Sequence, residues 1–198
     1  MQQQIILASQ SPRRAEILNW LGVDFLQYPA DIDETRLNHE SGQDYVIRLA
    51  VEKAQACAQL HPELSQGRLV LGSDTTVVVD EHVLEKPADQ ADLSRMLGLL
   101  SGRTHWVYTG VALYCDGTVH SQCVATQVRF RPISPAEMHF YWQSGEPRGK
   151  AGGYAIQGLG GQFVSHISGS YSAVMGLPLY ETADMLRSAG ILLKGVDK

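Results

Sequence analysis

The stretch Ile5-Ile6-Leu7-Ala8-Ser9-Gln10-Ser11-Pro12-Arg13-Arg14-Ala15-Glu16-Ile17-Leu18 predicts a short buried strand, a tight polar loop and then a helix. The continuous apolar run of Ile5–Leu7 is typical of a strand that is covered on both faces. Ser9 or Ser11 can cap the helix, and Pro12 stands where a proline of the first helical turn belongs. The chain therefore opens with a strand, a loop and a helix in direct succession.

Arg13 and Arg14 fall in the first turn of that helix, where the helix dipole favours acidic side chains and not basic ones. Their guanidinium groups, the hydroxyls of Ser9 and Ser11 and several backbone N–H groups would all meet at one helix end. A bound anion resolves this conflict, because helix N-termini and arginine side chains both bind phosphate. A surface loop with two solvated arginines is the alternative, and this stretch alone leaves both open.

The strongest strand of the sequence covers residues 69–79, which are apolar and β-branched on both faces. We expect it to be central and buried. Asp74 lies in its middle, where a carboxylate is costly unless it is paired, hydrogen-bonded or bound to a metal. Gly72 leaves room for a close approach to the backbone. A functional Asp74 is the favoured interpretation, and a carboxylate satisfied by backbone amides is the alternative.

A helix is predicted from a capping pattern at Ser41–Asp44 to about residue 60. Leu49, Lys53, Ala56 and Leu60 are spaced four, three and four residues apart, so they are expected to share one helix face. A lysine in such an apolar stripe either reaches out to water or points at a negative charge.

Helices and strands alternate early in the chain and a hairpin follows, so we expect a mixed α/β sheet. Asp116-Gly117 is a hairpin signal between two strands, and Ser134-Pro135-Ala136-Glu137 is a capping box that opens a helix. The other expected elements are a strand at 25–28, a helix after Asp89, strands at 105–114, 119–130 and 162–168, and a helix at 179–189.

Glycines crowd residues 149–161, which indicates special backbone angles and close approach to a partner or ligand. A flexible loop is the alternative. Tyr154, Ile156 and Leu159 argue against it, because a disordered linker lacks large apolar side chains.

The composition excludes several classes of function. A net charge of −5 argues against a non-specific binder of nucleic acid or of an acidic membrane, so any anion site needs a local group of cations. Cys57, Cys115 and Cys123 form no CxxC pair, which argues against a disulfide framework or a structural zinc site. The sequence has no signal-peptide pattern and no apolar run near 18 residues, so we expect a cytoplasmic protein.

The charged residues in structured places suit a polyphosphate with a divalent metal ion, because Mg²⁺ and Mn²⁺ prefer carboxylate and phosphate oxygens. They are the cations Arg13, Arg14, Lys53 and Lys86, the acids Glu34 and Asp74, and the hydroxyls of Ser9 and Ser11.

Several blocks, in order, resemble the Maf family of nucleotide pyrophosphatases over nearly the whole chain. Beside residues 8–18, they are Glu52-Lys53-Ala54, Gly72-Ser73-Asp74-Thr75, Glu85-Lys86-Pro87, Leu100-Ser101-Gly102, Lys150-Ala151-Gly152-Gly153-Tyr154 with Ile156-Gln157-Gly158, and Gly169-Ser170-Tyr171 with Gly176-Leu177-Pro178.

This resemblance implies hydrolysis of a nucleoside triphosphate to the monophosphate and diphosphate with Mg²⁺ or Mn²⁺. It implies an α/β protein with the two-lobed Maf/ITPase-like fold, in which residues 1–198 form a single domain. An elongated mixed β-sheet is flanked by helices, and the active cleft lies centrally between the lobes. A homodimer is also expected from it.

The resemblance also implies a role for each site residue. Asp74 is the proton acceptor, with Lys53, Lys86 and Glu34 as further catalytic residues and Glu34 and Asp74 as metal ligands. Ser9, Arg13 and Arg14 bind the substrate.

Arg13, Thr75 and Gln157 match the positions that divide the family, and the threonine and glutamine go with dTTP and UTP. A sister branch linked to 7-methyl-GTP has glutamate at the position of Gln157. One carboxamide can meet the N3–H and an adjacent carbonyl of thymine or uracil, whereas the two donors of guanine suit a carboxylate. The alternatives are the same reaction on modified or non-standard nucleotides, and a nucleotide-binding regulator of septum formation and cell division.

Overall fold

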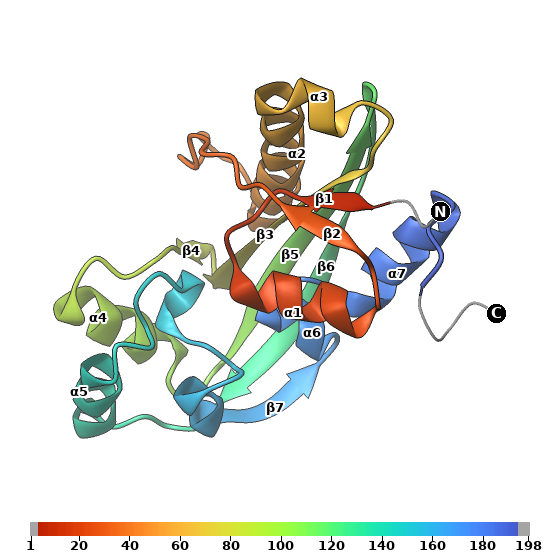
Figure 1. Ribbon diagram of the computed structural model, residues 1–198. Coiled ribbons are helices and arrows are strands. Elements are labelled where there is room, and N and C mark those ends of the chain that lie inside the picture. The colour runs from red at the N-terminus through yellow and green to blue at the C-terminus, as the bar shows by residue number, and fades with distance from the viewer. Residues whose placement is uncertain (1–3, 194–198) are drawn as a thin grey trace. The chain divides into compact units, whose positions relative to one another are not determined.

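The predicted opening strand and helix are β1, Ile5–Leu7, and α1, Pro12–Trp20, in the computed structural model, which describes residues 4–193 (Figure 1). Ser11 holds the N-cap position with an extended backbone and precedes Pro12. Within the described residues its side chain makes no capping hydrogen bond. The Ser11 N–H instead donates to the hydroxyl oxygen of Ser9 at 3.2 Å, so the polar loop folds back on itself before α1 begins.

Within residues 4–193, seven strands form one mixed sheet with the order β2-β1-β3-β5-β6-β7, and β4 pairs with β3. β1 runs parallel to β2 and β3, whereas β4 is antiparallel to β3 and β7 is antiparallel to β6. The bounds are β2 Phe25–Gln27, β3 Val70–Val79, β4 His82–Leu84, β5 Thr104–Cys115, β6 Thr118–Phe130 and β7 Val164–Ser168. The predicted mixed α/β class is therefore confirmed.

Helix ends follow the predicted caps. The side chains of Ser41 and Asp89 each accept the N–H of the third residue after them, and Ser134 forms a full capping box with Glu137. The helices are α2 Gly42–Leu60, α3 Pro62–Ser65, α4 Gln90–Leu100, α5 Pro135–Gln143, α6 Tyr171–Met175 and α7 Leu179–Ser188, with 3₁₀ turns η1 Ala151–Gly153 and η2 Leu159–Phe163. Of the helices formed by residues 4–193, none combines the length and the apolar composition that a bilayer crossing needs.

Two compact units divide the chain, and each is assembled from segments far apart in sequence. Unit 1 contains residues 4–74, 109–124 and 176–193, and unit 2 contains residues 75–108 and 125–175. Strands β3, β5 and β6 contribute residues to both. A single domain over residues 1–198 with a cleft between two lobes stays a prediction.

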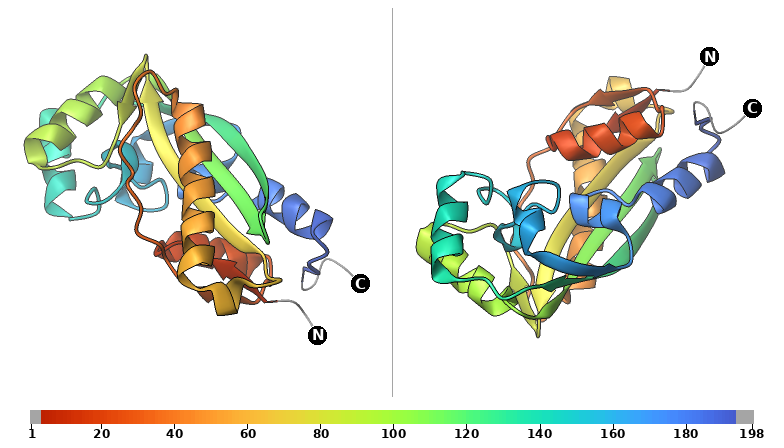
Figure 2. Two further views of the ribbon diagram at one scale, coloured as in Figure 1. Left: turned by 90° about the horizontal axis from the view of Figure 1, so that it is seen from above. Right: turned by 90° about the horizontal axis from the view of Figure 1, so that it is seen from below.

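In unit 1, α2 lies along one face of the strands, and α1 and α7 lie on the other face (Figure 2). The contact of α2 is made at two glycines. A Cβ on Gly72 of β3 would overlap the carbonyl oxygen of Ala50, and one on Gly110 of β5 would overlap that of Val46. Neither glycine has a positive φ, so each is required for space and not for its backbone angles.

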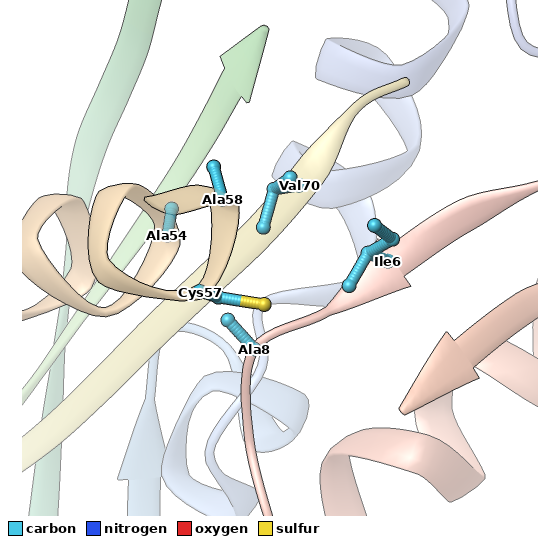
Figure 3. Packing of buried hydrophobic residues seen from close by; sticks show 6 residues of the cluster. All are labelled: Ile6, Ala8, Ala54, Cys57, Ala58 and Val70. Carbon is cyan, nitrogen blue, oxygen red and sulfur yellow. The ribbon is translucent and has the colours of Figure 1, made fainter. Parts of the chain in front are cut away.

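Small side chains of α2 pack against β1 and β3 in the core of unit 1 (Figure 3). The buried members of this cluster are Ile6, Ala8, Ala54, Cys57, Ala58 and Val70. The Cys57 thiol donates to the carbonyl oxygen of Tyr28 at 3.0 Å, and burial raises its pKa to about 11. Cys57 is therefore a structural residue that stays a thiol near neutral pH.

The apolar face expected for α2 is partly wrong. Leu49 and Lys53 are buried, but Ala56 is only half-buried and Leu60 is 61% exposed. The close contacts at Gly72 and Gly110 turn the line through residues 46, 50 and 54 toward the sheet. The buried stripe then continues through residues 57 and 58, and Leu60 falls outside it.

Unit 2 packs α4 against α5 and η1. The predicted apolar face of α4 is confirmed, because Leu93, Met96, Leu97 and Leu100 are all buried. The N–H of Gly152 in η1 donates to the carbonyl oxygen of Glu85 at 3.0 Å. The glycine-rich segment is therefore tied to the chain immediately before Lys86.

Buried aromatic rings form a second part of the core of unit 2. Nε2 of His105 lies 2.8 Å from the hydroxyl of Tyr154, and both rings contact Phe130 edge-on. Burial lowers the pKa of His105 to about 4, so its imidazole is neutral near pH 7.

We expect Gly72→Ala to lower the free energy of unfolding by about 3 kcal/mol, because the new methyl overlaps the backbone of α2. Gly98→Ala in α4 is the control, since a Cβ there meets none of the described atoms within 4 Å. It should be neutral or stabilise by up to about 1 kcal/mol. Urea unfolding followed by tryptophan fluorescence measures both, and equal stabilities would contradict the contact.

Candidate active site

An ion-paired cluster of three side chains lies in unit 1. Nζ of Lys53 is 2.6 Å from Oδ1 of Asp74 and 2.7 Å from Oε1 of Glu34. Lys53 and Asp74 are each 8% exposed, whereas the Glu34 side chain keeps 37% of its surface accessible. Lys53 therefore points at negative charge, and the buried carboxylate of Asp74 is paired with a cation. Two acids on one ammonium give the cluster a net negative charge.

Helix α2 positions two members of this cluster. Its backbone rests on Gly72, two residues before Asp74 on β3, so Lys53 comes to lie beside that carboxylate. The hydroxyl of Tyr45 donates to the carbonyl oxygen of Glu34 at 2.8 Å. A second tie is made by Arg48, whose Nη2 donates to the carbonyl oxygen of Thr35 at 3.1 Å. The loop that carries Glu34 is thus bound to the same helix as Lys53.

Arg14 is held at the start of α1 by main-chain and side-chain oxygens. Its Nη1 donates to the hydroxyl oxygen of Ser9 at 3.0 Å, and its Nε donates to the carbonyl oxygen of Gly176 at 2.8 Å. The hydroxyl of Ser73 also lies 3.0 Å from that carbonyl oxygen. Arg14 is therefore an anchored side chain, and the alternative of a solvated surface arginine is wrong for it.

Electrostatics link Arg14 to the ion-paired cluster. Burial lowers the pKa of Arg14, and the charge of Arg13 adds to this effect. The charges of Asp74 and Glu34 act in the opposite direction and favour the guanidinium cation. The start of α1 and the cluster therefore lie within electrostatic range of each other, which gathers cations and acids at one place in unit 1.

The sequence-predicted site residues divide between the units. Unit 1 contains Ser9, Arg13, Arg14, Glu34, Lys53 and Asp74. Its contacts join Arg14 to Ser9 and join Lys53 to both acids. Unit 2 holds Thr75, Lys86 and Gln157. Thr75 is half-buried and follows Asp74 directly on β3, whereas Lys86 and Gln157 are exposed.

The acids of the cluster can hold a divalent metal only together with other ligands. Glu34 and Asp74 each place one oxygen on Lys53 and have a second oxygen. Within residues 4–193 no group of three or more His, Cys, Asp or Glu side chains is arranged to hold a metal ion. Mg²⁺ commonly binds one or two carboxylates together with substrate phosphates, and this pair of acids fits that mode.

Several supporting residues were missed at the level of sequence. Tyr45, Leu49 and Lys53 are spaced four residues apart, so helical periodicity could have placed Tyr45 on the face of Lys53. Gly176 acts through its carbonyl oxygen, for which the sequence has no signal. Ser73 was visible only as a neighbour of Asp74.

We expect Lys53→Met to lower the free energy of unfolding by about 3 kcal/mol, because it leaves the carboxylate of Asp74 buried without its cation. Adding Asp74→Asn should recover part of this loss, so the double variant should be more stable than the sum of the single effects by about 1 kcal/mol or more. Urea unfolding of wild type, both single variants and the double variant measures the coupling. Strict additivity would rule out the pair.

Comparison with known proteins places the chain in a family. A family model described as Maf-like protein matches residues 4–189. A dTTP/UTP pyrophosphatase of Pseudoalteromonas atlantica is 53% identical over 182 residues, which cover 92% of this chain and 95% of that protein. A dTTP/UTP pyrophosphatase of Colwellia psychrerythraea is 50% identical over 191 residues, which cover 96% and 90%.

Among solved structures, a nucleoside-triphosphatase described as a dITP/XTP pyrophosphatase, from Mycobacterium abscessus, aligns with 96% of this chain and 98% of its own. Its TM-score is 0.44 at 15% identity, so the family assignment rests on the sequence matches. The family model spans nearly all of the described residues, and the two relatives are at least 50% identical to this chain over the aligned residues. The chain therefore belongs to the Maf family.

Proposed function

We propose that this protein is a nucleotide diphosphatase that hydrolyses dTTP and UTP to the nucleoside monophosphate and diphosphate. The observation that carries the proposal is the buried Asp74, paired with Lys53 and within electrostatic range of Arg14 at the start of α1. The relatives named for this activity align over at least 90% of both chains, which supports the same reaction here.

The start of α1 binds the triphosphate in this proposal. Backbone N–H groups of a helix N-terminus favour phosphate oxygens, and arginine donates to them in pairs. Arg14 is already oriented by Ser9 and Gly176, so less side-chain entropy is lost when the substrate binds. Arg13 and Lys53 add positive charge that offsets the repulsion between the phosphates and an attacking water.

Asp74 accepts the proton in the chemical step. A water oxygen bonds to the α-phosphorus while the bond from that phosphorus to the bridging oxygen breaks, and diphosphate leaves in line. The proton of the water passes to Asp74, whose other oxygen is held by Lys53. Glu34 and Asp74 would hold a divalent ion, Mg²⁺ or Mn²⁺. The ion would supply charge neutralisation at the phosphates.

Unit 2 contributes the remaining residues of the proposal. Lys86 neutralises phosphate charge, and Thr75 and Gln157 select the base. The hydrogen bond from Gly152 to Glu85 supports this grouping, because it joins the segment of Gln157 to that of Lys86 within one unit. A cytoplasmic location and a homodimer stay predictions.

We expect Asp74→Asn to lower kcat by about a thousandfold, because the amide cannot accept the proton. Far-ultraviolet circular dichroism should show an unchanged fold. Diphosphate release from dTTP and UTP with Mg²⁺ or Mn²⁺ measures the effect. Asp184→Asn, on the exposed face of α7, is the matched control and should retain wild-type turnover. Turnover of Asp74→Asn near the wild-type value would refute the assignment.

We expect Gln157→Glu to lower kcat/KM for dTTP and UTP by about tenfold relative to other nucleoside triphosphates, because a carboxylate cannot donate to a pyrimidine carbonyl. A panel of nucleotides, each assayed by diphosphate release, measures this selectivity. Gln66→Glu, at the exposed position that follows α3, controls for the added charge. An equal loss for all nucleotides would argue against base reading by Gln157.

A further inference from the structure

The segment that carries Gln157 is hydrogen-bonded on both sides by two side chains of unit 2. The carboxylate of Glu146 accepts the N–H of Leu159 at 2.8 Å and the N–H of Gly160 at 2.8 Å. The hydroxyl of Tyr141 accepts the N–H of Ala155 at 3.1 Å and donates to Oε1 of Glu146 at 2.7 Å. These bonds reach the backbone two residues before Gln157 and two and three residues after it.

The two side chains that make these bonds are themselves held in place. Tyr141 lies in the last turn of α5 with none of its surface exposed, and its ring packs edge-on against Phe163 with 5.2 Å between centroids. Glu146 is half-buried, and burial by itself raises the pKa of its carboxyl. The hydrogen bonds from Gly160, Tyr141 and Leu159 outweigh burial and lower that pKa. The ionised carboxylate therefore fits this site, because three donors face it.

The close packing of two glycines also indicates that the segment of Gln157 fits closely against Glu146 and Tyr141. A Cβ on Gly158 would overlap the carboxylate of Glu146, and one on Gly160 would lie 2.6 Å from the hydroxyl oxygen of Tyr141. The φ of Gly158 is 177°, an extended value that any residue adopts. A side chain at residue 158 would therefore have to displace the carboxylate of Glu146.

We propose that Glu146 and Tyr141 are positioning residues that set the base selectivity of the enzyme by holding the backbone on both sides of Gln157. The inference rests on the proposed function, in which Gln157 reads the pyrimidine. A carboxamide matches the N3–H and the neighbouring carbonyl together only when its position is fixed, and a displacement of about 1 Å is enough to lose most of such a contact. Neither Glu146 nor Tyr141 is required to touch the substrate for this effect.

Glu146→Gln tests the proposal with almost no change in side-chain size. The carboxylate accepts two backbone N–H groups, whereas the glutamine places its NH₂ group, a donor, against one of them. The ratio of kcat/KM for dTTP to that for dGTP, measured by diphosphate release, should fall roughly tenfold, mainly through a higher KM for dTTP. In a Gln157→Ala background the same substitution should change the ratio by less than about twofold, because it acts through Gln157.

Glu137→Gln is the matched control. It makes the same chemical change in the same unit. The carboxylate of Glu137 binds Arg131 and accepts the N–H of Ser134 at the start of α5, so it is not one of the groups that hold the segment of Gln157. It should lower stability without altering the ratio. Tyr141→Phe removes two of the four hydrogen bonds and should also lower the ratio, so it carries the test if Glu146→Gln does not fold.

An unchanged ratio in Glu146→Gln, or an equal fall in both backgrounds, would overturn the inference while the proposed function stands. Wild-type protein that releases no diphosphate from dTTP or UTP would overturn the proposed function, and this inference with it.

Discussion

The backbone of α2 lies directly on two strands of unit 1, with no side chain between them at Gly72 and Gly110. This contact fixes the height of the helix above the sheet, and it thereby fixes the relation of Lys53 to Asp74. The separation of the two backbones that carry this pair is thus set by main-chain packing. Because α2 also holds the loop of Glu34 through Tyr45 and Arg48, this helix positions two of the three charged groups of the cluster, Lys53 and Glu34.

Charge burial in unit 1 is better explained by chemistry than by stability. A buried ion pair seldom stabilises a fold more than apolar side chains of the same size would, because both charges must leave water. Here a buried pair, a further acid and a half-buried arginine occur together, and the arginine is bound to a main-chain carbonyl of Gly176. In the proposed function, this arrangement would bind the triphosphate together with a divalent ion. Arg14 and Lys53 are held by their partners in the structure, which would favour binding of the triphosphate in that function.

Most of the secondary structure and part of the site could be predicted from local pattern. Capping residues located α2, α4 and α5, and a carboxylate inside an apolar strand identified Asp74. The predicted place of Leu60 was wrong, because the rotation of α2 is set by glycines on other elements. The short elements α3, β4 and α6 have too few residues to show a period. The contacts of Gly176 and Glu146 depend on backbone groups that the tertiary structure brings together. The residue types in the sequence do not indicate such contacts. How Thr75, Lys86 and Gln157 act with Asp74 stays a prediction.

The hydrogen bond between Arg14 and Gly176 joins two residues that are synthesised at different times. Unit 1 begins with the first described residues and is completed only by residues 176–193. Since a chain grows from its N-terminus, β1 and α1 leave the ribosome long before the carbonyl that holds Arg14 is made. During that interval the Nε–H of Arg14 lacks the carbonyl oxygen that accepts it in the folded protein. A chain that stops before residue 176 would therefore lack one of the two oxygens that orient the guanidinium of Arg14.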